Sequence, residues 1–361
     1  MVEYILAVGV SFLFSCIYDL NINSSSSLGK KQDYRFAVLK IVLAVLAGFP
    51  FFYLQARRNE LGADYQLYAN EFVYINSGSG YVHSDSGFQE LNRLVFFFGG
   101  DYKAMFAVVA FIQTVGVYSL AVSLGVPLSI FSLLYFLTFN YLQSFSLIAQ
   151  YTAIGIICLA FSLMLKRFYV PSLVLLVIAA TIHSSSYIFF VYFLFYIFLA
   201  KTRNKVRLSV LFAVAAVIFA SVSSKLLPLI LKNTRFGVYY ERDNTDLNST
   251  SMIVINMFIV LLMIMVFLIE TDVRENVCYN FFFSIQFMAL VAALLQPVVP
   301  LMVRMAMYFS FFEVYSVPLV LQKLSNKQLQ SVICIITLLA FTAWFYLYPV
   351  AGNYYQVIPY R

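Results

Sequence analysis

This chain of 361 residues has few charged side chains: only 11% of its residues are Asp, Glu, Lys or Arg. A soluble globular domain carries about 25% charged residues. Apolar residues make up 62% of the chain and the mean hydropathy is +0.87, and a water-soluble fold of this length cannot bury so much apolar surface. The composition therefore excludes a soluble enzyme, a disordered chain and a disulfide scaffold, and it predicts a protein embedded in lipid.

Histidine and cysteine are also rare. The two histidines, His83 and His183, are too few for a histidine-rich metal centre or a heme bundle, although a single histidine can still act in catalysis. The four cysteines stand alone in apolar runs without Cys-x-x-Cys spacing, which is typical of small hydrophobic side chains. Walker motifs and glycine-rich dinucleotide turns are missing, so we expect no cofactor and no metal.

Long apolar runs recur along the chain, and they predict an all-α, polytopic integral membrane protein. A helix needs about 20 apolar residues to cross the hydrocarbon core, which gives about 10–12 transmembrane helices in a single transmembrane domain over residues 1–361. The predicted spans are 2–18, 36–54, 104–124, 128–145, 147–165, 171–199, 208–231, 251–269, 278–296, 301–321 and 330–348.

The run 171–199 is too long for one crossing, since a single helix would measure about 44 Å. Its centre is polar around His183, and basic clusters flank it at 166–167 and 201–207. Basic residues collect in cytoplasmic loops, so both clusters are predicted to lie on the same side. We therefore expect two short helices, or a re-entrant hairpin, with His183 near the tip; a long tilted helix is the alternative.

Under this topology the segment 55–103 is the only large external loop. The other external segments are 232–250, 297–300 and 349–361. Loops longer than about 15 residues are usually functional or disordered. Charges of both signs and many tyrosines argue against disorder in 55–103, which makes this loop the predicted location of chemistry.

Two groups in the loop favour chemistry on a phosphorylated sugar. Arg57 and Arg58 follow the second span, where adjacent guanidinium groups can hold a phosphate through paired hydrogen bonds. The alternative is that both side chains only reach lipid headgroups beside the span. Asp85 and Glu90 are candidate bases for a sugar hydroxyl, or else belong to a solvated amphipathic helix over 86–98.

Further candidates lie in or near the apolar runs. Gln150 and His183 are polar residues inside predicted helices, which are functional hypotheses by default. Arg235 belongs to a second basic and aromatic external stretch, and Arg304 begins the tenth run with Tyr308 one turn later. Several arginines with few acids in the helices indicate an anionic, lipid-linked ligand. The net charge of +7 is explained by basic cytoplasmic loops, so we expect no nucleic acid.

The order of these residues resembles the EpsG-like branch of the Wzy-type polysaccharide polymerases, over nearly the whole chain. The matching elements are Arg-x-x-x-x-Gly-x-Asp-Tyr-x-x-Tyr (Arg57 or Arg58, Gly62, Asp64, Tyr65, Tyr68), acidic-x-Gly-Phe-x-x-Leu-Asn (Asp85, Gly87, Phe88, Asn92), Gln-x-x-Ala (Gln150, Ala153), Ala-x-x-His-x-Ser (Ala180, His183, Ser185), Arg-x-x-x-Tyr with a later proline (Arg304, Tyr308, Pro318) and the final Pro359-Tyr360. Each element is weak alone, and the series is considerably more specific.

The resemblance implies glycosyl transfer at the outer face of the bacterial cytoplasmic membrane, from an undecaprenyl diphosphate carrier to a sugar hydroxyl of a new lipid-linked repeat unit. It implies Asp85 or His183 as proton acceptor. The implied diphosphate ligands are Arg57, Arg58, Arg304 and Arg235, and the implied substrate contacts are Asp64, Tyr65, Tyr68, Glu90, Gln150 and Tyr308. The expected partners are undecaprenyl-diphosphate-linked glycans, membrane lipids, and a chain-length regulator and flippase.

The chain departs from the family pattern at Ala149. The family usually has Ile-Arg-Gln where this chain has Ile148-Ala149-Gln150, so either activity is lost or Arg58, Arg235 or Arg304 takes over. Asp85 also stands where glutamate is commoner. A flippase for lipid-linked oligosaccharides and a membrane O-acyltransferase acting on sugars are the alternative functions, although His183 has no acid within fifteen residues in sequence.

Overall fold

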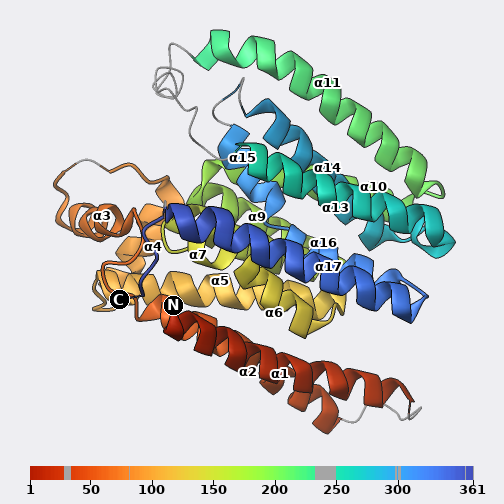
Figure 1. Ribbon diagram of the computed structural model, residues 1–361. Helices are drawn as coiled ribbons and strands as arrows, with labels where there is room; N and C mark the ends of the chain where they lie inside the picture. Colours follow the sequence, from red (N-terminus) through yellow and green to blue (C-terminus); the bar gives the residue numbers. More distant parts are fainter. Residues whose placement is uncertain are drawn as a thin grey trace. The chain divides into compact units, whose positions relative to one another are not determined.

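The computed structural model describes residues 1–27, 34–80, 82–231, 249–296, 299, 302–353 and 355–360. Within these ranges the regular elements are helices and no strand occurs (Figure 1). Eight of the helices are long and apolar enough to cross a membrane, and two shorter ones are also apolar. The predicted all-α, polytopic membrane fold is confirmed.

The chain forms two compact units, Met1–Phe193 with Ile336–Arg361, and Leu194–Ile335. The helices that begin in the first unit are α1 (Val2–Ser27), α2 (Tyr34–Ala56), α3 (Tyr65–Ser77), α4 (Ser86–Phe97), α5 (Tyr102–Leu124), α6 (Leu128–Leu137), α7 (Asn140–Gln143), α8 (Ile148–Leu165), α9 (Tyr169–Ile182), the 3-10 turn η1 (Ser184–Tyr187), α10 (Ile188–Lys201) and the π-turn η3 (Tyr346–Val350). Those that begin in the second are α11 (Lys205–Leu231), α13 (Ser249–Ile269), η2 (Thr271–Val273), α14 (Val277–Leu295), α15 (Met302–Ser310), α16 (Glu313–Lys323) and α17 (Lys327–Phe345).

Two predicted spans are each divided in two. The run 128–145 leaves the helix after Leu137, because Phe139 adopts the left-handed conformation with φ of 64°. The short α7 that follows is held by hydrogen bonds to its neighbours: the Tyr151 hydroxyl donates to Gln143 Oε1 at 2.6 Å. The run 301–321 divides into α15 and α16, and Glu313 lies in the first turn of α16, where the helix dipole favours an acid.

The predicted division of 171–199 is confirmed. The helix α9 ends at Ile182, and His183 is extended, with φ of −150° and ψ of 113°. The rings of Tyr169 and Phe193 lie 6.4 Å apart, although 23 residues separate them. The chain therefore reverses direction at η1, as in a hairpin of two short helices, and the alternative of one long tilted helix is wrong.

The helices α5 and α8 cross closely because glycine lies at the contact. A Cβ added to Gly116 would lie 2.9 Å from the Cα of Gly155, and closer still to its carbonyl. Small residues at such crossings let backbones approach, which is how helices associate in lipid. A hydrogen bond from Gln113 Nε2 to Thr152 Oγ1 (3.3 Å) lies beside the crossing. The close crossing of α5 and α8 therefore fixes the positions of polar residues such as Gln113 and Thr152 in the first unit.

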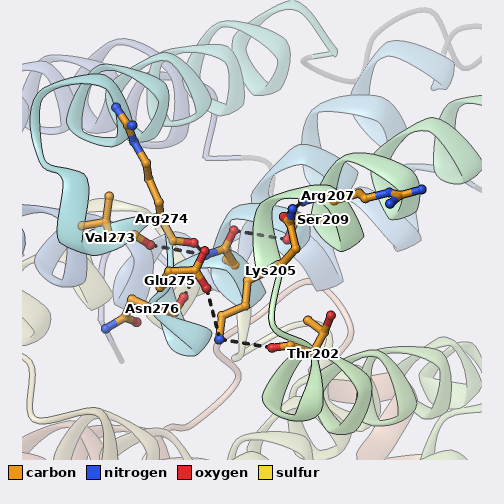
Figure 2. Close-up of polar contacts among 10 residues, drawn as sticks. Thr202, Lys205, Arg207, Ser209, Val273, Arg274, Glu275 and Asn276 are labelled. Atoms are coloured by element: carbon orange, nitrogen blue, oxygen red, sulfur yellow. Dashed lines mark hydrogen bonds and ion pairs between the residues drawn. The ribbon is translucent and has the colours of Figure 1, made fainter.

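In the second unit, loops from three places in the chain meet at one end, and Figure 2 shows two of them, around Lys205 and Glu275. Lys205 Nζ lies 3.3 Å from Glu275 Oε2 and donates to the Thr202 carbonyl at 3.3 Å. The Ser325 N–H donates to Glu270 Oε1 at 2.8 Å. The basic clusters at 201–207 and 323–327 therefore lie at the same end of this unit, as the predicted topology requires.

Gly116→Ala tests the helix crossing. We expect the extra methyl group to separate α5 from α8 and lower the free energy of unfolding by about 1–3 kcal/mol. Thermal unfolding in detergent measures the effect. The control is Gly9→Ala, since a Cβ at Gly9 meets nothing within 4 Å. Equal unfolding temperatures for both variants would contradict close packing at the crossing.

Candidate functional site

Arg58 is a buried cation at the end of α2. Its side chain is 3% exposed, and it donates from Nη1 to the carbonyl of Phe145 at 3.0 Å. The guanidinium carbon lies 4.3 Å from the ring centroid of Phe106 and 5.4 Å from that of Phe145. Its Nε and Nη2 atoms find no hydrogen-bond partner among the described residues. Two of its three nitrogens are thus buried without a hydrogen-bond partner, which makes Arg58 a candidate ligand for an anion.

The charge of Arg58 persists at neutral pH. Burial lowers the pKa of this guanidinium to about 10, while nearby tyrosine hydroxyls, Tyr65 foremost, act in the opposite direction. A buried charge is costly unless a counter-charge or hydrogen bonds satisfy it. Arg57 differs, because it is exposed and lies over the ring of Tyr53 at 5.7 Å. The structure therefore separates the predicted pair into one buried and one exposed arginine.

A glycine docks the loop after Arg58 against the start of α8. Gly62 has φ of +105°, and a Cβ there would lie 2.8 Å from the carbonyl carbon of Phe145. The next N–H, that of Ala63, donates to Ser146 Oγ at 2.9 Å and to the Tyr355 carbonyl at 2.8 Å. The Gly62 position of the family pattern thus has a physical role: only glycine allows the loop to approach the backbone this closely.

The C-terminal tail completes the same region. The Tyr360 hydroxyl donates to the carbonyl of Leu54 at 2.8 Å, and the Tyr4 hydroxyl donates to that of Val357 at 2.8 Å. Figure 1 shows both chain ends on the side of α3 and α4. The tail therefore covers the end of α2 from which Arg58 projects, which the sequence indicated only through the Pro359-Tyr360 element.

Tyr68 links Arg58 to the position where the family has its arginine. The Tyr68 hydroxyl is close enough to raise the pKa of Arg58, and it accepts a hydrogen bond from the Ala149 N–H at 3.4 Å. Ala149 and Gln150 are both buried in the first turn of α8. Neither amide atom of Gln150 finds a partner among the described residues. The N-terminus of α8 therefore presents amide groups and helix dipole beside the buried cation.

The predicted acid and histidine are brought together. Asp85 Oδ2 accepts a hydrogen bond from the Ser184 N–H at 2.7 Å, one residue beyond His183. Gly87 lies directly against Thr181, with 2.7 Å from an added Cβ to the Thr181 carbonyl carbon. The tip of the α9–α10 hairpin therefore contacts the start of α4, so the hairpin tip and segment 55–103 lie at the same end of the unit, as the predicted topology requires.

Aromatic contacts join the region around Arg58 to the region around Asp85 and the hairpin tip. The rings of Tyr68 and Phe88 meet edge to face at 5.4 Å. Tyr65, 3% exposed, packs on Phe106 at 4.9 Å, the ring that also lies under Arg58. Asp64 is half-buried at the start of α3. The predicted residues of the first two motifs thus share one region of the first unit.

Glu71 is a functional candidate that the sequence did not reveal. Its side chain is 3% exposed, and Oε1 accepts hydrogen bonds from the N–H groups of His83 (2.6 Å) and Ser84 (2.7 Å). It thereby fixes the backbone just before Asp85. The available signal was its spacing, one turn after Tyr68 on α3. Glu90 lies on the exposed side of α4 and forms an ion pair with Arg93.

The remaining predicted residues lie elsewhere. Arg304 and Tyr308 belong to α15 in the second unit, where Tyr308 is fully buried and Arg304 is half-buried. Arg235 lies outside the described residues. A diphosphate site shared by Arg58 and Arg304 stays a prediction. Groups of three or more His, Cys, Asp or Glu side chains able to hold a metal are not found in the described ranges.

Apolar helices and a buried, partly unsatisfied arginine define a polytopic membrane protein with an anion-binding candidate site at one end. The model of the EpsG family matches residues 40–361, so the chain belongs to the EpsG family. The match connects this membrane protein with polysaccharides. No curated protein and no solved structure matches the chain at a significant level.

Gly62→Ala tests whether loop docking holds the site. A methyl group at φ of +105° and against Phe145 should cost about 1–3 kcal/mol and release the loop that follows Arg58. Gly78→Ala is the matched control, because Gly78 also has positive φ (+67°) but open space around it. Thermal unfolding of both variants gives the comparison. A larger loss for Gly78→Ala would contradict the docking role.

Proposed function

We propose that this protein is a glycosyltransferase that polymerises undecaprenyl-diphosphate-linked oligosaccharide repeat units at the outer face of the bacterial cytoplasmic membrane. In the reaction, a sugar hydroxyl of one repeat unit attacks the anomeric carbon of the growing glycan. The bond from that carbon to the diphosphate breaks, and the lipid diphosphate leaves. The hydroxyl proton passes to a base. The observation that carries the proposal is the buried Arg58 with two free nitrogens.

A departing diphosphate is the anion that this arrangement suits. Arg58 offers its Nε and Nη2 donors from a buried aromatic setting, where a charge interaction is stronger than in water. The first turn of α8 adds the positive end of a helix dipole. Stabilising developing negative charge in this way is commonly the largest single contribution to catalysis. Arg57, exposed next to Arg58, supplies a second cation.

Arg58 also accounts for the departure from the family pattern at Ala149. Arg58 donates to the Phe145 carbonyl four residues before Ala149, so a guanidinium reaching from the end of α2 serves the place where the family's arginine stands on α8. We assign the role to Arg58 on its contacts in the first unit, since Arg304 belongs to the second unit and Arg235 lies outside the described residues.

Asp85 or His183 is the proposed proton acceptor. One carboxylate oxygen of Asp85 is held by the Ser184 N–H, which orients the other oxygen and ties the acid to the hairpin tip that carries His183. Tyr65, Tyr68, Asp64 and Gln150 are the proposed sugar and diphosphate contacts around it. Glu90 is a weaker candidate, because its carboxylate pairs with Arg93 on the exposed face of α4.

Arg58 substitutions test the proposal in purified protein supplied with lipid-linked repeat units. Loss of one preorganised donor group costs roughly 10²–10³ in rate, so we expect Arg58→Ala to reduce the glycan ladder by about that factor. Arg58→Lys should give an intermediate rate, because lysine keeps the charge without the planar fork. Adding Ala149→Arg to Arg58→Ala should restore part of the activity.

The controls separate chemistry from folding. Arg93→Ala removes an exposed arginine of the same segment and should leave the ladder unchanged. Thermal unfolding of every variant identifies those that fail to fold. A folded Arg58→Lys protein with the wild-type rate would contradict the diphosphate role, and transport of lipid-linked units without any ladder would support the flippase instead.

A membrane O-acyltransferase remains a second candidate because of one observation. That reaction needs an acid near the histidine, and the fold places Asp85 against the residue after His183 although 98 residues separate them in the chain. Transfer of an acyl group to a sugar without formation of a glycan ladder would favour the acyltransferase over the polymerase.

Asp85→Asn and Asp85→Glu test the base. Asparagine keeps the hydrogen bond from Ser184 but cannot take a proton, so we expect a rate loss of roughly 10²–10⁴ with little change in unfolding temperature. Glutamate, the commoner family residue, should retain activity. The pH profile of the surviving activity is the measurement, since a purely structural Asp85 would leave that profile unchanged in the asparagine variant.

A further inference from the structure

A groove separate from the site runs along three membrane-spanning helices of the first unit. It has a volume of about 420 Å³ and is walled by α2, α5 and α8. Its wall on α2 contains Ala44 and Gly48, two small residues on one helical face. A Cβ on Gly48 would lie 3.0 Å from Thr114, so the groove has its depth because glycine is there. This volume is within the range of ligand sites in proteins.

One end of the groove is basic and hydroxyl-rich. Lys166 is the single charged residue in its lining, and Arg167 follows it; both are exposed. Neither base forms an ion pair with another residue of the described ranges. At the same end Ser123 and Ser162 share a hydrogen bond of 2.6 Å. An apolar channel with a cation and hydroxyl groups at one end matches a lipid chain with an anionic head.

The length of the groove identifies which lipid it suits. Its wall on α2 runs from Ile41 to Phe52, which is about 16 Å along a helix. That is about half of the ~30 Å hydrocarbon core, the depth of one leaflet. Its basic end lies at the start of α2, whereas Arg58 follows the end of α2. A lipid whose phosphate is held at Arg58 would therefore enter from the wrong end.

We infer that this groove is a binding site for an anionic phospholipid of the leaflet on the Lys166 side. One acyl chain lies between α2, α5 and α8, and the headgroup phosphate lies at Lys166. The site is independent of the proposed reaction, because none of its lining residues belongs to the cluster around Arg58.

Lipid retention tests the inference. The full-length protein, purified in detergent with equimolar phosphatidylglycerol and phosphatidylcholine, is examined by native mass spectrometry for bound lipid. We expect the wild type to retain one phosphatidylglycerol selectively. Removing one basic residue near a headgroup weakens anionic lipid binding about fivefold, so Lys166→Gln should lower retention by that factor. Ala44→Phe should abolish it by filling the groove.

Matched variants and competing lipids make the result decisive. Lys201→Gln removes another exposed lysine at a helix end, and Val42→Phe enlarges an exposed residue of α2 outside the groove; both should retain lipid as the wild type does. Equal retention of phosphatidylcholine would overturn the inference. The inference would also be overturned if a polyprenyl phosphate displaced phosphatidylglycerol from the wild type but did not bind to Ala44→Phe. The groove would then hold a prenyl chain.

Discussion

A single buried positive charge organises this end of the molecule. Arg58 lies at the end of a membrane-spanning helix, 3% exposed, and one hydrogen bond to Phe145 is the only one it makes among the described residues. Burying a cation is costly, and aromatic faces and one carbonyl offset only part of that cost. The two remaining donors are buried without a partner, and this unsatisfied charge is the observation on which the proposed diphosphate site rests.

Irregular backbone beside the spans makes room for this charge. Only the short α7 interrupts the irregular chain between Leu137 and Ile148, so the Phe145 carbonyl accepts from Arg58 and the Ser146 hydroxyl accepts from the Ala63 N–H of the Gly62 loop. The hairpin tip after Ile182 offers its backbone to Asp85 in the same way. Such backbone is tolerated at membrane depth only where protein or a polar cavity satisfies it.

The candidate site was partly predictable. Arg58 and Asp85 followed from the phosphate-holding and acidic residues of the one large external loop, and His183 followed from a polar residue inside an apolar run. The helix break at His183 followed from run length and the flanking bases. The burial of Arg58, in contrast to exposed Arg57, could not be predicted, because only tertiary packing decides which of two adjacent residues after α2 turns toward Phe106 and Phe145. Glu71 was missed since its role is to hold backbone groups, and that leaves no sequence motif.

The sequence by itself determined that the solvent of this protein is lipid and where most of its long apolar helices lie, because hydrophobic burial depends on composition and on run length. It also determined the family, through residues in a fixed order. Only the tertiary structure decided which of those residues meet. Asp85 and Ser184, and Tyr68 and Ala149, are joined by contacts between distant segments, and such contacts depend on helix crossings at Gly116 and Gly155 and on close backbone approach at Gly62.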